Sequence, residues 1–199
     1  MKKVLLLGDS IRMGYDDYVK EELDGKCEVV YDAEDNGRFA AYTLWQANQM
    51  FKHHGHFDVV HWNNGYWDMN IEAPMTEAMH PVEEYVHFLK RIIKLCRENG
   101  AKIIFATTTP ILEPGMAADK INAQRGAAAI LCQHHAAVVS LGLNAKADLL
   151  TTKAIAHEIA VRVICIVNHR AGVVLSAFCL TPDGNRRRSA VRDTVRSGS

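Results

Sequence analysis

Short apolar runs alternate with amphipathic stretches along the chain as far as Pro110. Buried strands are predicted where apolar residues run together, at residues 4–7, 27–31, 57–62 and 102–106. Helices are predicted between the strands, where apolar residues recur at helical spacing, at residues 15–23, 42–51 and 82–98. Strands that alternate with helices form βαβ units around a parallel sheet, so the pattern predicts an α/β fold.

The pattern is less regular after Pro110. Helices are predicted at residues 117–140, where alanine is frequent, and at residues 144–160, and a fifth strand is predicted at residues 161–167. Because the chain has no internal repeat and no clear linker, we predict a single domain over residues 1–199. Residues 115–199 are atypical of such a domain, since the local patterns agree less well there.

The composition is that of an ordinary globular protein. The 199 residues are 48% hydrophobic and 23% charged, which suffices for a sizeable core. Lysine plus arginine (23) balances aspartate plus glutamate (23), so we expect neither nucleic acid nor a membrane surface as a partner. No apolar run is long enough to cross a bilayer, and the first apolar run is too short for a signal peptide, so a cytoplasmic location is expected.

The cysteines and histidines do not form a recognisable metal-binding pattern. The 5 cysteines are scattered without a Cys-x-x-Cys pair, which argues against a disulfide framework and against structural zinc. His53, His54 and His56 follow a predicted helix, and a solvated helix end accounts for them because histidine suits the negative end of the helix dipole. We therefore expect no metal and no organic cofactor.

Polar residues follow three of the predicted strands at the point where each strand ends. They are Gly8-Asp9-Ser10, Asn36-Gly37-Arg38-Phe39 and Asn63-Asn64-Gly65-Tyr66-Trp67-Asp68. The carboxyl ends of parallel strands lie along one edge of a sheet, where ligands bind in open α/β folds. A serine hydroxyl, a glycine N–H and an asparagine carboxamide suit acyl transfer, because the serine can attack a carbonyl carbon while the donors stabilise the negative oxygen. The alternative is that these segments are only turns, which their residue types also favour.

These three segments resemble the sequence blocks of the SGNH/GDSL hydrolase superfamily. The resemblance implies a flavodoxin-like, three-layer α/β/α sandwich with a mainly parallel five-stranded sheet. It also implies that Ser10 is the nucleophile, and that the N–H groups of Ser10 and Gly37 donate hydrogen bonds to the oxyanion. In the third segment the family usually has Gly-x-Asn-Asp, whereas this chain has Asn-Asn-Gly, which is similar to a bacterial subgroup with Asn-x-Gly. Asn63 is therefore the expected third donor, with Asn64 as the alternative.

Two carboxylates lie beside these residues in the sequence. Asp9 is interpreted as fixing the turn around Ser10, and Asp68 as orienting the third segment, rather than as an acid–base pair. A serine hydroxyl is a weak nucleophile, so the site still needs a proton acceptor.

The family takes this acceptor from the histidine of an Asp-x-x-His motif, and no such motif follows the fourth predicted strand. The family often continues from the histidine into Leu-Thr-Pro-x-Gly, which is present here as Leu180-Thr181-Pro182-Asp183-Gly184. That anchor puts Cys179 in the place of the histidine and Ser176 in the place of the aspartate. A thiol with a pKa of about 8.5 is a poor substitute for the imidazole.

Three explanations of the missing histidine remain open. The chain is a weak or inactive relative that binds a ligand; another histidine, His169 or His61, is the base; or a frameshift has altered the C-terminal third relative to an active parent. The resemblance implies a serine ester hydrolase that acts through Ser10 on a small-molecule ester or an O-acetylated carbohydrate, weakly if the base is missing. The alternative function is non-catalytic binding of the same ligands.

Overall fold

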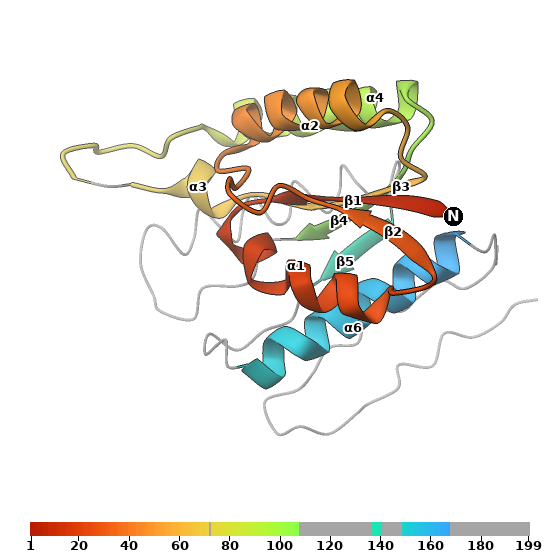
Figure 1. The fold of residues 1–199 in the computed structure, drawn as a ribbon. Coiled ribbons are helices and arrows are strands. Elements are labelled where there is room, and N and C mark those ends of the chain that lie inside the picture. Colours follow the sequence, from red (N-terminus) through yellow and green to blue (C-terminus); the bar gives the residue numbers. More distant parts are fainter. Residues whose placement is uncertain (72, 108–136, 141–148, 168–199) are drawn as a thin grey trace, which may run out of the picture.

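The computed structural model describes residues 1–71, 73–107, 137–140 and 149–167 of the chain (Figure 1). The strands are β1 (Lys2–Gly8), β2 (Cys27–Val30), β3 (Val59–Asn63), β4 (Lys102–Thr107) and β5 (Ala137–Ser140). The helices are α1 (Ser10–Glu22), α2 (Ala40–His54), α3 (Tyr66–Met69), α4 (Val82–Glu98) and α6 (Leu149–Val167).

These strands form one sheet in the order β2-β1-β3-β4-β5, and each pair of neighbours is parallel. This is the flavodoxin-like order, in which ligands bind at the carboxyl ends of the strands. In the register of the sheet, Gly8 at the end of β1 lies beside Asn63 at the end of β3, and Asn63 lies beside Ala106 of β4. The central strands therefore end level with one another, and the loops that follow β1 and β3 leave from the same edge.

Helices cover both faces of this sheet, with α2 and α4 on one side and α1 and α6 on the other (Figure 1). Leu5 and Leu7 of β1 belong to the core beneath α2 and α4. Val4 and Leu6 belong to the core beneath α1 and α6. Because both faces of β1 are buried, its apolar residues follow one another without alternation. The predicted α/β fold and three-layer sandwich are confirmed.

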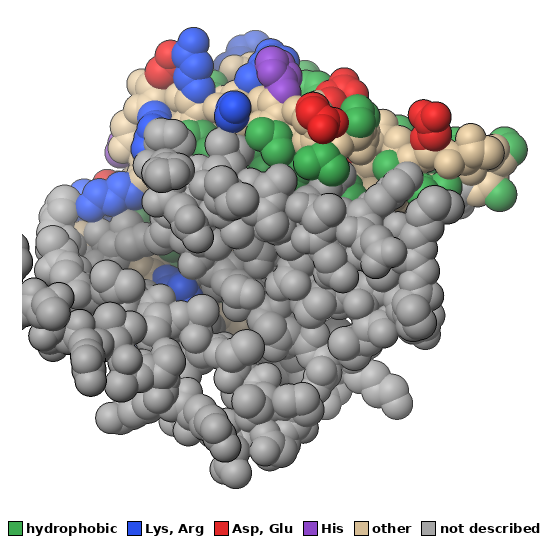
Figure 2. All heavy atoms as spheres, turned by 180° about the vertical axis from the view of Figure 1, so that it is seen from behind, with side chains coloured by type: hydrophobic (Ala, Val, Ile, Leu, Met, Phe, Trp, Pro, Cys, Tyr) green, Lys and Arg blue, Asp and Glu red, His purple; other side chains and the backbone are tan. Residues whose placement is uncertain are grey.

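The outer layer of α2 and α4 follows the sequence pattern closely. α4 spans Val82–Glu98 as predicted, and its buried residues recur at helical spacing, namely Tyr85, Leu89, Ile92, Ile93 and Cys96. Its charged residues lie on the opposite side of the helix, and Figure 2 shows charged side chains over the outer surface of this layer. Among the described residues, no helix has the length and apolar character needed to cross a membrane.

One helix on the other face begins earlier than its pattern predicts. α1 starts at Ser10 rather than at residue 15, because the side chain of Asp9 accepts a hydrogen bond from the N–H of Ile11 and caps the helix. The prediction missed this start because Arg12 and Asp16 interrupt the apolar pattern. Both of these charged side chains are nevertheless buried.

The fifth strand lies elsewhere than predicted. β5 occupies Ala137–Ser140, which is the end of a stretch predicted as a helix; the rest of that stretch lies outside the described residues. The predicted strand at residues 161–167 is wrong, because these residues form the last turns of α6. The buried apolar residues of α6 recur at helical spacing and belong to the same core as those of α1; they are Ile155, Ala156, Ile159, Ala160 and Val163. The local β-propensity of valine and isoleucine gives way to this packing.

Candidate active site

Ser10 is the first residue of α1 and follows β1 after a single intervening residue. Its side chain is exposed, and none of the described residues forms a hydrogen bond with its hydroxyl. The N–H groups of the first turn of a helix point outward, and they carry the positive end of the helix dipole. An oxyanion that forms beside Ser10 would therefore meet a favourable electrostatic environment.

Asp9 connects the start of α1 to the end of β3. Its carboxylate is 1% exposed, and Oδ1 accepts hydrogen bonds from the N–H of Ile11 at 3.0 Å and from Nδ2 of Asn63 at 2.7 Å. The other oxygen, Oδ2, is buried without a hydrogen-bond partner in the described part of the chain. Burial raises the pKa of Asp9 to about 6, against the opposing effect of the two hydrogen bonds.

Asn63 ends β3 and packs directly against Gly8. Its Oδ1 accepts a hydrogen bond from the hydroxyl of Tyr15 at 3.0 Å, while its Nδ2 donates to Asp9. Gly8 has a φ of 144°, and a Cβ at this position would meet the carboxamide of Asn63 and lie 2.7 Å from the backbone oxygen of Asn63. Only glycine allows this conformation and this approach. The close packing of Asn63 against the end of β1 therefore depends on Gly8.

Gly37 brings the second predicted segment against the first. Its N–H donates to the backbone oxygen of Gly8 at 2.5 Å, and a Cβ on Gly37 would lie 2.8 Å from the same oxygen. The N–H predicted to stabilise an oxyanion is thus engaged with the main chain in this structure. The next residue, Arg38, has a φ of 45°, and its N–H donates to Oδ1 of Asn36 at 2.8 Å.

Asn64 ties the third segment to the second. Its Nδ2 donates to the backbone oxygen of Arg38 at 3.1 Å and to Oγ1 of Thr43 at 2.8 Å. The Thr43 hydroxyl in turn donates to the backbone oxygen of Gly37 at 2.7 Å. Both N–H bonds of the Asn64 carboxamide are used in this way, whereas only one N–H of Asn63 is donated to a described residue.

The buried carboxylate of Asp68 forms a pair with the half-buried His80 that the sequence analysis did not foresee. Its carboxylate accepts the N–H of Ala40 at the start of α2, and its Oδ1 lies 2.8 Å from Nδ1 of His80. This hydrogen bond raises the pKa of His80, whose ring also packs edge-on against Phe39. Nothing in the spacing of Asp68 and His80 predicts the pair, because a loop without a regular pattern separates them. Asp68 thereby joins the third segment to α2.

His61 lies in the core beneath α1 and α6. Its ring is fully buried, and burial lowers its pKa to about 3, with a smaller effect of the Arg162 charge in the same direction. A shielded imidazole with so low a pKa is a weak proton acceptor, so the geometry argues against His61 as the base for Ser10. The other predicted base, His169, lies outside the described residues, as do Ser176 and Cys179.

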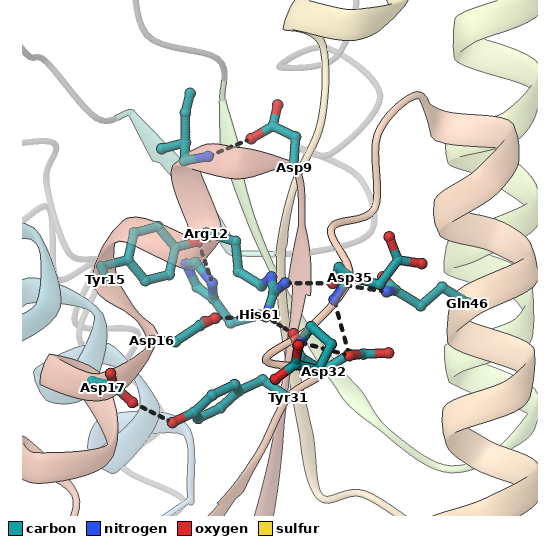
Figure 3. A network of polar contacts seen from close by, with 12 residues as sticks. Asp9, Arg12, Tyr15, Asp16, Asp17, Tyr31, Asp32, Asp35, Gln46 and His61 are labelled. Carbon is teal, nitrogen blue, oxygen red and sulfur yellow. Dashed lines mark hydrogen bonds and ion pairs between the residues drawn. The ribbon is translucent and has the colours of Figure 1, made fainter.

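A buried polar network lies behind these loops (Figure 3). Arg12 is 1% exposed and pairs with Asp16, its Nη1 lying 2.5 Å from Oδ2. The same guanidinium donates to the backbone oxygens of Asp32 and Asp35, each at 2.8 Å. Burial raises the pKa of Asp16 to about 7, and the Arg12 charge opposes this change.

Arg12 thereby fastens the loop after β2 to α1. Since that loop carries Gly37 and α1 carries Ser10, the guanidinium supports the relative position of two predicted site residues. The sequence analysis missed Arg12. The only signal was an aspartate four positions further along, a spacing that brings opposite charges together on a helix.

Comparisons with known proteins establish the fold. No protein-family model matches the chain, and no curated protein matches its sequence. An alpha/beta hydrolase enzyme from the metagenome of Lake Arreo has a TM-score of 0.66 at 15% identity, covering 83% of this chain and 96% of that one. A GDSL-like lipase from Bacteroides thetaiotaomicron has a TM-score of 0.62 at 15% identity, covering 84% and 88%. The chain has the SGNH/GDSL hydrolase fold.

A third solved structure with this fold is a carbohydrate esterase family 2 enzyme from Corynascus thermopiles. It has a TM-score of 0.63 at 15% identity, covering 84% of this chain and 67% of that one. Within the SGNH/GDSL fold of this chain, each pair of predicted segments is joined by a hydrogen bond. Ser10, Gly37 and Asn63 therefore converge at one edge of the sheet.

Proposed function

We propose that the chain is a serine ester hydrolase in which Ser10 accepts an acyl group and passes it to water. One observation carries the proposal: Ser10 is exposed at the N-terminus of α1, and the residue before it, Asp9, accepts a hydrogen bond at 2.7 Å from the carboxamide of Asn63 at the end of β3. Solved structures with the same fold include a GDSL-like lipase and an esterase, which supports this class of chemistry.

In the proposed reaction the Ser10 oxygen attacks the carbonyl carbon of an ester. The electron pair of the C=O bond moves to oxygen, and the Ser10 proton passes to a base. The oxyanion accepts hydrogen bonds from the N–H of Ser10 and from the Nδ2 hydrogen of Asn63 that Asp9 does not use. The alcohol then leaves with a proton, and water attacks the acyl ester of Ser10 to release the acid and restore the hydroxyl.

Two requirements of this reaction concern the N–H of Gly37 and the base. The N–H of Gly37 can join the oxyanion hole only if its hydrogen bond to Gly8 opens. The base remains a prediction, with His169 as the candidate. We propose a small-molecule ester or an O-acetylated carbohydrate as the substrate.

A second candidate function is non-catalytic binding of the same ligands at the same edge. Two observations favour it: the N–H of Gly37 is already engaged, and no histidine among the described residues forms a hydrogen bond with Ser10. Binding needs neither an activated serine nor a free oxyanion donor.

Hydrolysis of an aryl acetate separates the two functions. We expect Ser10→Ala to lower kcat by about 1,000-fold or to the uncatalysed rate, because no other described group is placed to take the acyl group. Glu21→Ala, an exposed change on the same helix, is the matched control and should leave kcat unchanged.

Equal turnover by the wild type and Ser10→Ala would overturn the hydrolase proposal. Absence of turnover by the wild type, together with calorimetric binding of an acetylated sugar, would support the second candidate.

A further inference from the structure

We infer that Tyr15, which lies behind the candidate site, is a positioning residue that fixes the orientation of the Asn63 carboxamide. The inference rests on the proposed function and names a residue that the three predicted segments do not contain. Tyr15 lies on the face of α1 that packs against the sheet and is 1% exposed. Its hydroxyl donates to Oδ1 of Asn63 at 3.0 Å.

A carboxamide can turn by half a rotation and exchange its oxygen and nitrogen with little change of shape. The two neighbours of Asn63 distinguish these orientations. On one side the Tyr15 hydroxyl offers a proton, and on the other side the Asp9 carboxylate accepts one at 2.7 Å. In the turned orientation the NH2 group would face the hydroxyl and the oxygen would face the carboxylate, which costs at least one buried hydrogen bond.

The observed orientation is the one that suits an oxyanion hole. Nδ2 carries two hydrogens, of which one is donated to Asp9, and no described residue accepts the other. Tyr15 therefore keeps a donor, rather than an acceptor, on the side of Asn63 that faces Asp9 and the start of α1. This arrangement stabilises negative charge only as long as the carboxamide does not turn.

His61 supports the same orientation from the core. Its Nδ1 lies 3.5 Å from the Tyr15 oxygen, and the two rings meet edge-on with centroids 5.8 Å apart (Figure 3). His61 is neutral because burial lowers its pKa to about 3, and burial keeps the Tyr15 hydroxyl protonated by raising its pKa. When Nδ1 carries the ring proton it donates to the Tyr15 oxygen, which directs the Tyr15 proton to Asn63. In that tautomer, His61 supports the hydrogen bond from Tyr15 to Asn63 instead of competing for the same proton.

The test is Tyr15→Phe, which removes the hydroxyl and keeps the ring. We expect kcat for an aryl acetate to fall about 10-fold, less than for loss of an oxyanion donor, with KM changed by less than about 2-fold. Tyr85→Phe is the matched control: Tyr85 is also 1% exposed, and its hydroxyl donates to the backbone oxygen of Asn64 at 2.9 Å. The control should lose similar stability and keep its kcat.

A second readout does not depend on activity. In the wild type, the side-chain N–H hydrogens of Asn63 should exchange slowly with solvent, because the Tyr15 hydroxyl and the Asp9 carboxylate hold the carboxamide at both ends. In Tyr15→Phe we expect this solvent exchange to be about 10-fold faster, and in Tyr85→Phe we expect no change.

The outcomes separate this inference from the proposed function. Loss of kcat in Tyr15→Phe alone supports the positioning role, whereas unchanged kcat and unchanged solvent exchange of the Asn63 side chain overturn it. If the wild type has no turnover that depends on Ser10, the proposed function fails and the solvent exchange alone decides the inference. If Tyr15→Phe does not fold, rapid solvent exchange of the Asn63 side-chain hydrogens in the wild type would overturn the inference, and slow exchange would support it.

Discussion

Gly8→Ala is expected to lower the free energy of unfolding by about 3 kcal/mol or more, through backbone strain and overpacking together. The residue has a φ of 144°, which side chains other than glycine rarely adopt. The added Cβ would meet the carboxamide of Asn63 and lie 2.7 Å from the backbone oxygen of the same residue. Because that oxygen belongs to β3, the neighbouring strand or the end of β1 has to shift. We therefore also expect the hydrogen bond between Asn63 and Asp9 to be lost.

Urea unfolding followed by tryptophan fluorescence measures this effect, since Trp62 is fully buried. Gly14→Ala is the matched control, because Gly14 lies in α1 and a Cβ there would have no neighbour within 4 Å. Alanine is the better helix former, so the control should be more stable by about 0.5–1 kcal/mol. A Gly8→Ala protein as stable as the wild type would contradict the packing described at the end of β1.

Arg12→Met is expected to lower the free energy of unfolding by about 3–5 kcal/mol, because it breaks a buried ion pair. The substitution leaves the carboxylate of Asp16, which is 3% exposed, without its partner in the core. It also removes the hydrogen bonds to the backbone oxygens of Asp32 and Asp35. The loop that carries Gly37 is then held to α1 less firmly.

A double-mutant cycle checks this interpretation. Arg12→Met combined with Asp16→Leu replaces both charges by apolar side chains, so we expect at least half of the lost stability to return. Lys94→Met is the matched control, because Lys94 pairs with Glu98 at the same helical spacing but on the surface, at 3.7 Å. That change should cost about 0.5 kcal/mol or less. Additive effects of the Arg12 and Asp16 changes would show that the two residues do not stabilise each other.

The first half of the fold could be predicted because its signals are local. β4 is centred on Ile103-Ile104-Phe105, a run that suits a strand buried on both faces. α4 has a single apolar stripe on a charged helix, so its bounds follow from the pattern. The parallel direction of the strands followed from the alternation of strands and helices, whereas a flavodoxin-like sheet was implied only by the family resemblance.

The later elements could not be predicted for physical reasons. α6 is apolar over much of its surface, so its helical period is weak, and valine and isoleucine near its end favour a strand locally. β5 is short, with 4 residues, and it is a strand because it pairs with β4. The local sequence pattern does not reveal this pairing. Long-range packing decides both assignments.

The residues around the candidate site also differ in whether the local sequence or a long-range contact indicates them. Ser10 and Asn63 could be predicted to lie near each other because one follows the end of β1 and the other ends β3, and the parallel sheet brings strand ends together. Tyr15 and Arg12 could not be found as site residues, because their roles depend on contacts with β3 and with the loop after β2. His80 is the extreme case, since only the folded loop places it against Asp68.

The central claim is that Ser10 is an activated nucleophile, and labelling with a fluorophosphonate tests it most directly. Such a probe needs a serine that a base activates, whereas a serine in a turn or in a simple binding site reacts only slowly. Intact-mass measurement followed by peptide mapping should find one adduct per chain, on Ser10, and none on the Ser10→Ala protein. An unlabelled wild-type protein, or an adduct on another residue, would contradict the account.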